Sequence, residues 1–217
     1  MRGEINLCQV DKSYAKEIYK KIKLDILNLK IKDGDFLTLA ELAEKYNVSK
    51  TPVRDALGTL EIQGYLKSLP RKGYLVKAVT QRNIRESFQM RSILEIAAVN
   101  SAVEIASDSE LESILQLAMK FPNDSQSGEI SEFNELNDMF HMLIIKATHN
   151  SLLIETCEVI MENLSRILLM DCKKLEFINE KEDHINIAKA LIERDSKKAE
   201  ELMVKHISHL EARFYSK

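Results

Sequence analysis

Hydrophobic residues along the chain follow two patterns, and the change from one to the other divides the sequence in two. The first part begins with apolar positions such as Ile18 and Ile22, whose spacing predicts one buried face of a helix over residues 13–29. Short helical and strand-like runs follow. The second part keeps a helical period almost throughout and is nearly free of Gly and Pro. These patterns predict a small mixed domain at residues 1–78 and an all-helical domain at residues 79–217.

Capping and turn signals in the first part predict the order helix, short helix, tight turn, helix and hairpin. Thr38 is placed as the N-cap of the short helix, with Glu41 three residues later for a capping box. Ser49 opens the next helix, and Gly64 suits its end. Two strand-like runs around a basic tip predict a two-stranded hairpin: residues 65–69 and 73–76. This is the order of a winged helix-turn-helix, whose second short helix enters the DNA major groove.

Hydrogen-bond donors gather at the start of that second short helix, where such a domain contacts base edges. Lys50, Thr51 and Arg54 supply them. An Arg side chain can fork onto guanine, and Lys and hydroxyl groups hold phosphates. Through Ala78 the chain carries 15 Lys/Arg and 10 Asp/Glu, against 16 and 24 in the remainder. A basic head on an acidic body favours a polyanionic partner. A chance imbalance among solvated residues is the alternative.

Composition narrows the class of protein. Charged residues make up 30% and hydrophobic residues 45% of 217 residues, a balance that excludes a disordered chain. No apolar run reaches membrane-spanning length, and the N-terminus lacks the apolar segment of a signal peptide, so we expect a cytoplasmic protein. Cys8, Cys157 and Cys172 are widely separated and odd in number, which argues against a disulfide framework or a Cys-based zinc site.

The first predicted domain resembles a known family. Residues 42–57 (LAEKYNVSKTPVRDAL), with the runs at 60–66 and 71–76, are similar to the DNA-binding domain of GntR-type repressors. The resemblance implies a homodimer on a palindromic DNA operator. It implies contacts to DNA from the recognition helix and the wing: Ser49, Lys50, Thr51, Pro52, Arg54, Arg71, Lys72 and Gly73. Ala40 and Lys50 depart from the family, where Arg is usual, so no operator sequence is carried over.

The helical part resembles the FCD domain, the ligand-sensing domain of the FadR-like branch of that family. Residues 137–141 (NDMFH), followed by Asn150, carry the first similarity, and residues 183–206 carry the second. The resemblance implies an antiparallel helical bundle. It also implies a divalent metal ion, Zn, Ni or Mn, which the carboxylate of a small metabolite helps to coordinate. The implied ligands are Asn137, His141, His184 and His206.

The residues themselves give partial support for this metal site. Asn137 and His141 are four positions apart and share one face of a helix, while His184 and His206 fall on two later predicted helices. Histidine is the commonest metal ligand. The alternative for any one of these histidines is a surface position or a satisfied place in the core. The neutral amide of Asn137 is also a poorer ligand than a carboxylate.

Two arginines are candidates for binding the effector carboxylate. Arg91 lies on the first predicted helix of the second domain, at a position where the family often has Arg, and Arg166 is a weaker candidate of the same kind. An ion pair between Arg91 and Glu95, four residues apart, is an equally weighted alternative.

Three functions follow from these features. The favoured one is a ligand-responsive transcriptional regulator, a repressor by resemblance, that is not an enzyme. A constitutive DNA-binding dimer with structural histidines is the second. A metalloenzyme is the third, and it is disfavoured because the HExxH pattern is absent and Asn137 removes the nearest candidate carboxylate.

Overall fold

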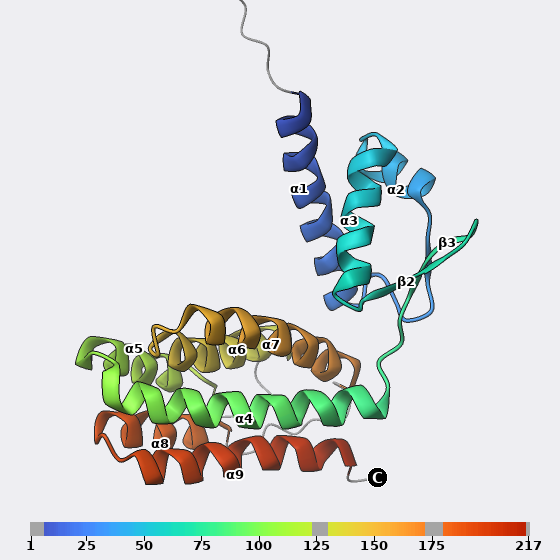
Figure 1. Cartoon of the computed structure of the whole chain (residues 1–217). Coiled ribbons are helices and arrows are strands. Elements are labelled where there is room, and N and C mark those ends of the chain that lie inside the picture. Colours follow the sequence, from blue (N-terminus) through green and yellow to red (C-terminus); the bar gives the residue numbers. More distant parts are fainter. Residues whose placement is uncertain (1–6, 123–129, 172–179, 216–217) are drawn as a thin grey trace, which may run out of the picture. The chain divides into compact units, whose positions relative to one another are not determined.

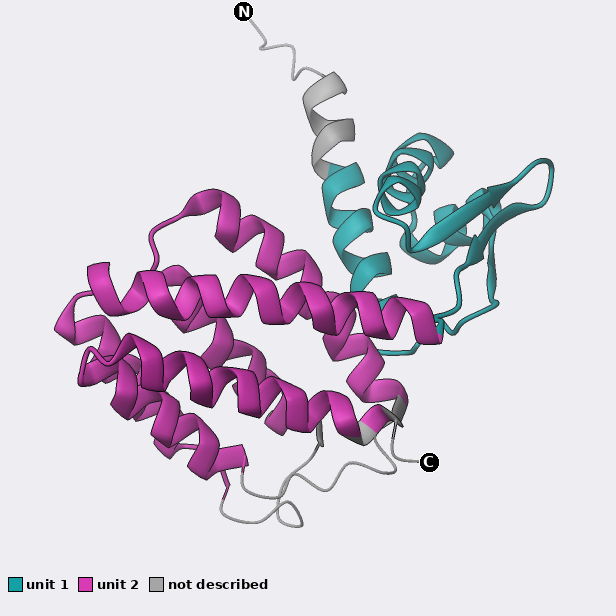
Figure 2. Ribbon diagram, turned by 60° about the horizontal axis from the view of Figure 1, so that its bottom comes forward, with its two compact units in different colours: residues 1–80 teal, residues 81–217 magenta. Residues whose placement is uncertain are grey.

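The computed structural model describes residues 7–122, 130–171 and 180–215, and the chain divides after Thr80 into two compact units. Unit 1 comprises residues 1–80 and unit 2 residues 81–217 (Figure 2). Each unit has its own hydrophobic core, so each is described by itself.

Unit 1 is a helical trio with a small sheet (Figure 1). Its elements, in chain order, are α1 (Leu7–Leu27), β1 (Phe36–Leu37), α2 (Leu39–Tyr46), α3 (Lys50–Ile62), β2 (Leu66–Leu69) and β3 (Gly73–Val76). The first helix starts earlier than the predicted residue 13 and ends two residues before the predicted Leu29. Leu29 has a φ of 56°, a left-handed conformation that an α-helix cannot contain.

Local caps fix the ends of the two short helices. The Thr38 hydroxyl accepts the backbone N–H of Glu41 at 3.2 Å and donates to the Glu41 carboxylate at 2.6 Å, so half of the predicted capping box forms. Ser49 is the N-cap residue of α3 but makes no side-chain cap hydrogen bond. Gly64, with a φ of 86°, follows α3, and the Tyr65 N–H reaches back to the Leu60 carbonyl at 3.0 Å.

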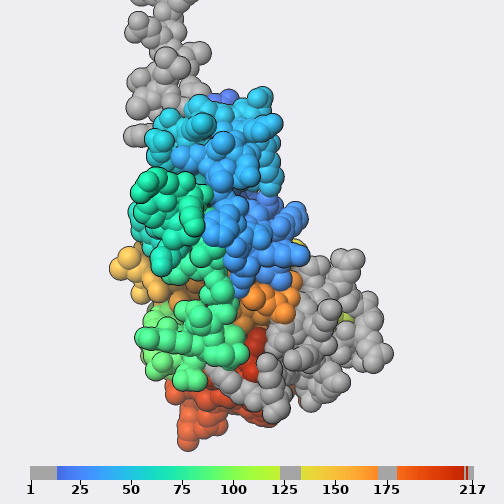
Figure 3. Space-filling view, turned by 90° about the vertical axis from the view of Figure 1, so that its right-hand side faces the viewer, coloured from blue at the N-terminus to red at the C-terminus, as the bar shows by residue number. Residues whose placement is uncertain are grey.

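The predicted two-stranded hairpin is in fact part of a three-stranded antiparallel sheet of order β1-β3-β2. The two-residue strand β1 pairs Phe36 with Leu75 and Leu37 with Tyr74. The strand approaches the hairpin closely at Gly73, where an added Cβ would lie 2.5 Å from the Leu37 carbonyl oxygen. Glycine is required there also because the φ of Gly73 is 111°. The hairpin that forms the wing lies at the face of unit 1 shown in Figure 3, and its tip at residues 70–72 is exposed.

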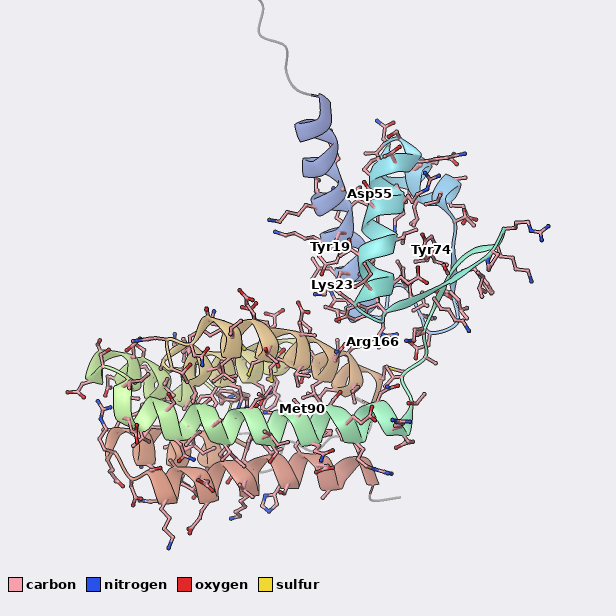
Figure 4. The ribbon with its side chains drawn as sticks, in the orientation of Figure 1. Tyr19, Lys23, Asp55, Tyr74, Met90 and Arg166 are labelled. Atoms are coloured by element: carbon pink, nitrogen blue, oxygen red, sulfur yellow. The ribbon has the colours of Figure 1, made fainter. Side chains whose placement is uncertain are left out.

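Helices α1 and α3 enclose the core of unit 1. The isoleucines of α1 that face α3 are buried, as their spacing predicts, and the core is completed from the other elements: Ile18, Ile22, Ile26, Leu42, Val53, Leu57, Leu60, Leu66 and Val76. At the edge of this core the Tyr19 hydroxyl donates to Gln63 Oε1 at 2.8 Å, and Lys23 lies 5.5 Å from the centroid of the Tyr19 ring (Figure 4).

Unit 2 is a bundle of helices, in agreement with the predicted all-α class. Its elements are α4 (Gln81–Ile105), α5 (Asp108–Met119), α6 (Ile130–Lys146), α7 (Ser151–Asp171), α8 (Glu180–Ile192) and α9 (Ser196–Tyr215). Helix α4 is central: it packs against α9 on one side and α7 on the other (Figure 1). Helix α6 packs on α7, and α8 packs on α5 and α9. Among the described residues, no helix combines the length and apolarity needed to cross a membrane.

Candidate metal centre and nucleic-acid interface

Three histidines meet inside unit 2. His141 from α6, His184 from α8 and His206 from α9 are each at most 1% exposed. One ring nitrogen from each lies within 4.8 Å of the others. The residues are 43 and 22 positions apart in sequence, so only the packing of three helices brings them together. The structure therefore assembles three of the four predicted metal ligands in one place.

Aromatic packing holds the middle histidine in position. The His184 ring centroid is 4.4 Å from that of Phe121 and 4.3 Å from that of Phe140. Among the described residues, neither ring nitrogen of His184 has a hydrogen-bond partner. Burial, and after it the nearby His206, His141 and Arg91, hold the pKa of His184 well below its usual range, so the ring is neutral. A buried imidazole without a partner costs stability, unless a ligand engages it.

His141 is held by two charged residues of α4. Its Nδ1 lies 2.6 Å from Glu95 Oε2, and its Nε2 lies 2.7 Å from Arg91 Nη2. Arg91 Nε also donates to Glu95 Oε1 at 2.6 Å. An ionised carboxylate only accepts hydrogen bonds, so Nδ1 of His141 carries the proton and Nε2 carries the lone pair.

The charge states of this group follow from its surroundings. Burial would raise the pKa of Glu95, but the positive charge of Arg91 and the hydrogen bonds from Arg91 and His141 lower it to about 2. Burial lowers the pKa of His141 to about 4, although Glu95 favours its charged form. Glu95 is therefore ionised and His141 neutral near neutral pH. A neutral His whose Nδ1–H is held by a carboxylate is the usual arrangement of a metal-bound histidine.

His206 also lies near acidic side chains. Its Nδ1 lies 3.6 Å from Glu180 Oε2 and 3.9 Å from Asp183 Oδ2, both on α8. The interaction with His206 lowers the pKa of Asp183. Its other nitrogen, Nε2, lies 3.2 Å from His141 Nε2. Two nitrogen ligands of a tetrahedral zinc ion are separated by about 3.3 Å, since each Zn–N bond is about 2.0–2.1 Å. The residues present therefore fit a divalent metal ion.

Buried amides extend this polar group along α6. Asn137 is 3% exposed and lies one helical turn before His141. Asn134 is 5% exposed. Within residues 7–122, 130–171 and 180–215, the Nδ2 of Asn137 and both Oδ1 and Nδ2 of Asn134 have no hydrogen-bond partner. Asp138, between them and His141 in sequence, is turned to Ser165 of α7, whose hydroxyl donates to its carboxylate. Buried amides without partners are suited to bind a polar ligand.

Sequence reasoning missed several of these residues. It considered Glu95 only as a partner of Arg91, and it did not select Glu180 or Asn134. A signal was present for two of them, because Glu180 lies one helical turn before His184 and Asn134 lies two turns before His141. For the contact between Glu95 and His141, 46 residues apart, the sequence holds no local signal.

The two arginines predicted to bind an effector are both buried. Arg91 is 1% exposed and takes part in the His141 group, where its Nη1 has no hydrogen-bond partner among the residues that the structure describes. It thus forms the ion pair with Glu95 that was the alternative interpretation, and it also reaches a predicted metal ligand. Arg166 is 4% exposed on α7 and follows Ser165 in sequence. Its role toward a ligand stays a prediction.

The candidate nucleic-acid interface lies on unit 1. The N-terminus of α3 presents three exposed side chains, Lys50, Thr51 and Arg54, and exposed Ser49 precedes them. Pro52 is buried in the first turn of α3, so its contribution is to the shape of the helix start. At the wing the basic tip is exposed and turns through a left-handed residue, since Arg71 has a φ of 64°. Helix N-termini and exposed cations are suited to phosphate groups.

Comparison with protein families matches both units. Residues 14–76 match the bacterial regulatory proteins of the gntR family, and residues 86–209, more than half of the chain, match the FCD domain. The chain belongs to the GntR family and carries an FCD domain. It is therefore a DNA-binding transcriptional regulator with an effector-binding domain, and not an enzyme.

Relatives of this GntR-family regulator match it over most of their length. It is 25% identical over 203 residues to the uncharacterized HTH-type transcriptional regulator YdhC of Bacillus subtilis, covering 90% of this chain and 88% of that protein. It is also 25% identical to the HTH-type transcriptional repressor RspR of Escherichia coli, covering 89% and 86% of the two chains. The structure of E. coli McbR/YncC has the same fold, with a TM-score of 0.79 at 22% identity over 93% of this chain and 97% of that one.

Proposed function

We propose that this regulator is a cytoplasmic, homodimeric repressor that binds a palindromic operator through α3 and the wing of each chain. We further propose that its FCD domain binds a divalent metal ion, Zn, Ni or Mn, together with a small carboxylate effector. His141, His184 and His206 would hold the metal, with Asn137 as the fourth candidate ligand. The observation that carries the effector site is the buried cluster of three histidines, in which neither nitrogen of His184 has a hydrogen-bond partner within the described part of the chain.

Each group of the cluster has a distinct part in this proposal. Glu95 orients His141 by accepting its Nδ1–H, and the acidic side chains of Glu180 and Asp183 face Nδ1 of His206. When bound, the metal supplies a positive centre that attracts a carboxylate. Imidazole and amide groups coordinate a metal ion in their neutral forms, so the four proposed ligands would add no negative charge of their own, and an anionic effector could supply it. Arg91 and Arg166 are the proposed cations for the carboxylate. The coupling to DNA affinity is expected to be about 1–3 kcal/mol.

A constitutive dimer with structural histidines is the second candidate. Histidines kept only for structure are expected to have hydrogen-bond partners when fully buried. His184 has none, which favours the ligand-responsive regulator.

The recognition-helix assignment is tested on an operator selected from a pool of random duplexes. Arg54→Ala should weaken binding to the selected operator by about 1–3 kcal/mol, because it removes a side chain that can fork onto a base. The residue is exposed, so the thermal unfolding midpoint should stay unchanged. Lys20→Ala, an exposed cation of α1, is the matched control and should bind nearly as the parent does. Unchanged affinity of Arg54→Ala, measured by fluorescence anisotropy, would contradict the assignment.

The homodimer is tested by mass and by symmetry. One recognition helix reads only a few base pairs, so a specific operator requires two of them related by a two-fold axis. Light scattering after size-exclusion chromatography should give twice the 24.9 kDa mass of the chain. The selected operator should be an inverted repeat, and a single half-site should bind much more weakly. A chain that stays at 24.9 kDa both alone and on DNA would exclude the dimer.

A further inference from the structure

The Nε2 atom of His141 has one lone pair, and Arg91 engages it. Arg91 Nη2 lies 2.7 Å from this nitrogen, while Arg91 Nε and His141 Nδ1 both donate to the Glu95 carboxylate at 2.6 Å. The three side chains thus form a closed ring of hydrogen bonds. The Nδ1 atom of His141 is occupied by its proton, so Nε2 is the only atom of the imidazole that can bind a cation.

A lone pair that accepts a hydrogen bond from a guanidinium cannot at the same time coordinate a metal ion. The two cations would also repel each other at this distance in a buried site. Arg91 is 1% exposed, so on leaving His141 it cannot be solvated by bulk water and needs another acceptor. Its Nη1 already has no hydrogen-bond partner in the described part of the chain. Once Nη2 is released, two nitrogens of one guanidinium are available, the geometry that a carboxylate accepts in a fork.

We infer that Arg91 gates the FCD site, by occupying the metal-binding nitrogen of His141 in the free protein and turning to the effector carboxylate in the loaded one. The inference rests on the proposed metal site. It adds a mechanism that couples the two binding events. The movement of Arg91 that frees Nε2 of His141 for a metal ion also makes its guanidinium available to the effector carboxylate. Metal and carboxylate therefore bind with positive cooperativity, each raising the affinity for the other.

A purely structural ion pair is the competing explanation, and α4 itself offers a comparison. Arg82 and Glu86 form a pair with the same four-residue spacing and an Nε–Oε1 distance of 2.7 Å. Its two side chains are 84% and 52% exposed, whereas those of Arg91 and Glu95 are 0% and 3% exposed. The contact from Nη2 to a metal-binding nitrogen distinguishes the buried pair. Arg82→Met is thus the matched control for Arg91→Met.

The test measures zinc affinity of the full chain, stripped of metal, by competition with a chromophoric chelator at one mildly alkaline pH. Acetate serves as the carboxylate probe because it binds free zinc weakly. In the parent chain, acetate should tighten zinc binding about tenfold. Arg91→Met should bind zinc about tenfold more tightly than the parent without acetate, because a buried hydrogen bond from a charged donor no longer competes. Acetate should then have no further effect, and Arg82→Met should behave as the parent.

Equal zinc affinity in Arg91→Met and the parent, or a full acetate effect in Arg91→Met, would overturn the gate while leaving the metal site intact. Zinc binding in none of the variants would overturn the metal site and the gate together.

Arg91→Met leaves Glu95 buried without its cation and risks unfolding, which circular dichroism detects. In that event Arg91→Met/Glu95→Gln is compared with Glu95→Gln, since the amide oxygen of the introduced glutamine can still accept the Nδ1–H of His141. The same gain in zinc affinity is expected in that comparison, and its absence would again exclude the gate.

Discussion

Replacing His184 with phenylalanine should lower zinc affinity by a factor of about 100 or more while keeping the fold. Changes to residues that only orient a ligand cost about 10–100-fold in metal affinity, so removal of a direct ligand should cost at least as much. Phenylalanine retains an aromatic ring between Phe121 and Phe140, whose centroids are 4.4 and 4.3 Å from that of His184, and removes only the nitrogens. The unpartnered nitrogens have no hydrogen bond to lose, so the substitution should not destabilise the metal-free chain.

His184→Ala is the complementary variant, because it removes the ring as well as the nitrogens. It should lose metal and the effector response, keep basal DNA binding, and lose some stability through the cavity it leaves. His209→Ala, an exposed histidine of α9 one turn after His206, is the control and should retain the metal. Elemental analysis and chelator competition measure these outcomes. Full metal content in His184→Phe would remove His184 from the site and leave the histidines with a structural role.

Acidification should destabilise the metal-free chain through its buried neutral histidines. The pKa of His141 is lowered from 6.5 to about 4 by burial, and that of His184 is also lowered. Between pH 6.5 and about 4, His141 binds more protons in the unfolded chain than in the folded one. Its contribution to the free energy of unfolding is therefore fully present above pH 6.5 and is lost as the pH falls toward 4. For His141 alone the loss is roughly 3 kcal/mol at most.

Asp138 has the opposite effect on the pH dependence of stability over part of this pH range. Burial raises its pKa to about 6, against the hydrogen bond from Ser165, so the folded chain takes up a proton there before the unfolded one does. Denaturant titrations at a series of pH values separate the two effects. His141→Gln should flatten the acid-induced loss of stability, and Asp138→Asn should steepen it. If His141→Gln leaves the slope unchanged, a charged His141 in the folded chain would be indicated.

The fold of unit 1 follows largely from helix-capping and turn signals that can be read directly from the sequence. Thr38 caps α2 through its hydroxyl, and Gly64, which has no Cβ, adopts the positive φ needed after α3; both lie where the sequence predicts them. The sheet was only partly predictable. Strand β1 has two residues, Phe36 and Leu37, too few for any alternating pattern, and it forms because it pairs with β3 from the far end of the unit.

The candidate metal site could be predicted from the sequence only in part. The positions of His141, His184 and His206 follow from family resemblance, but their hydrogen-bond partners do not. Arg91 and Glu95 have the same spacing as Arg82 and Glu86, so no pattern in the sequence distinguishes the buried pair from the exposed one. Only the packing of α4 against α6 decides which pair meets a histidine, since that contact spans 46 residues.

The single hydrogen bond from Arg91 to His141 has a consequence for how such a regulator would process information. A sensor whose metal and anion sites are independent responds to either signal by itself. Under the proposed gate, one nitrogen atom is shared between the contact with Arg91 and the metal, so each signal alone must also offset the cost of breaking that contact. The FCD domain would then act as a coincidence detector. It would respond more weakly to free metal or to the metabolite alone than to both together.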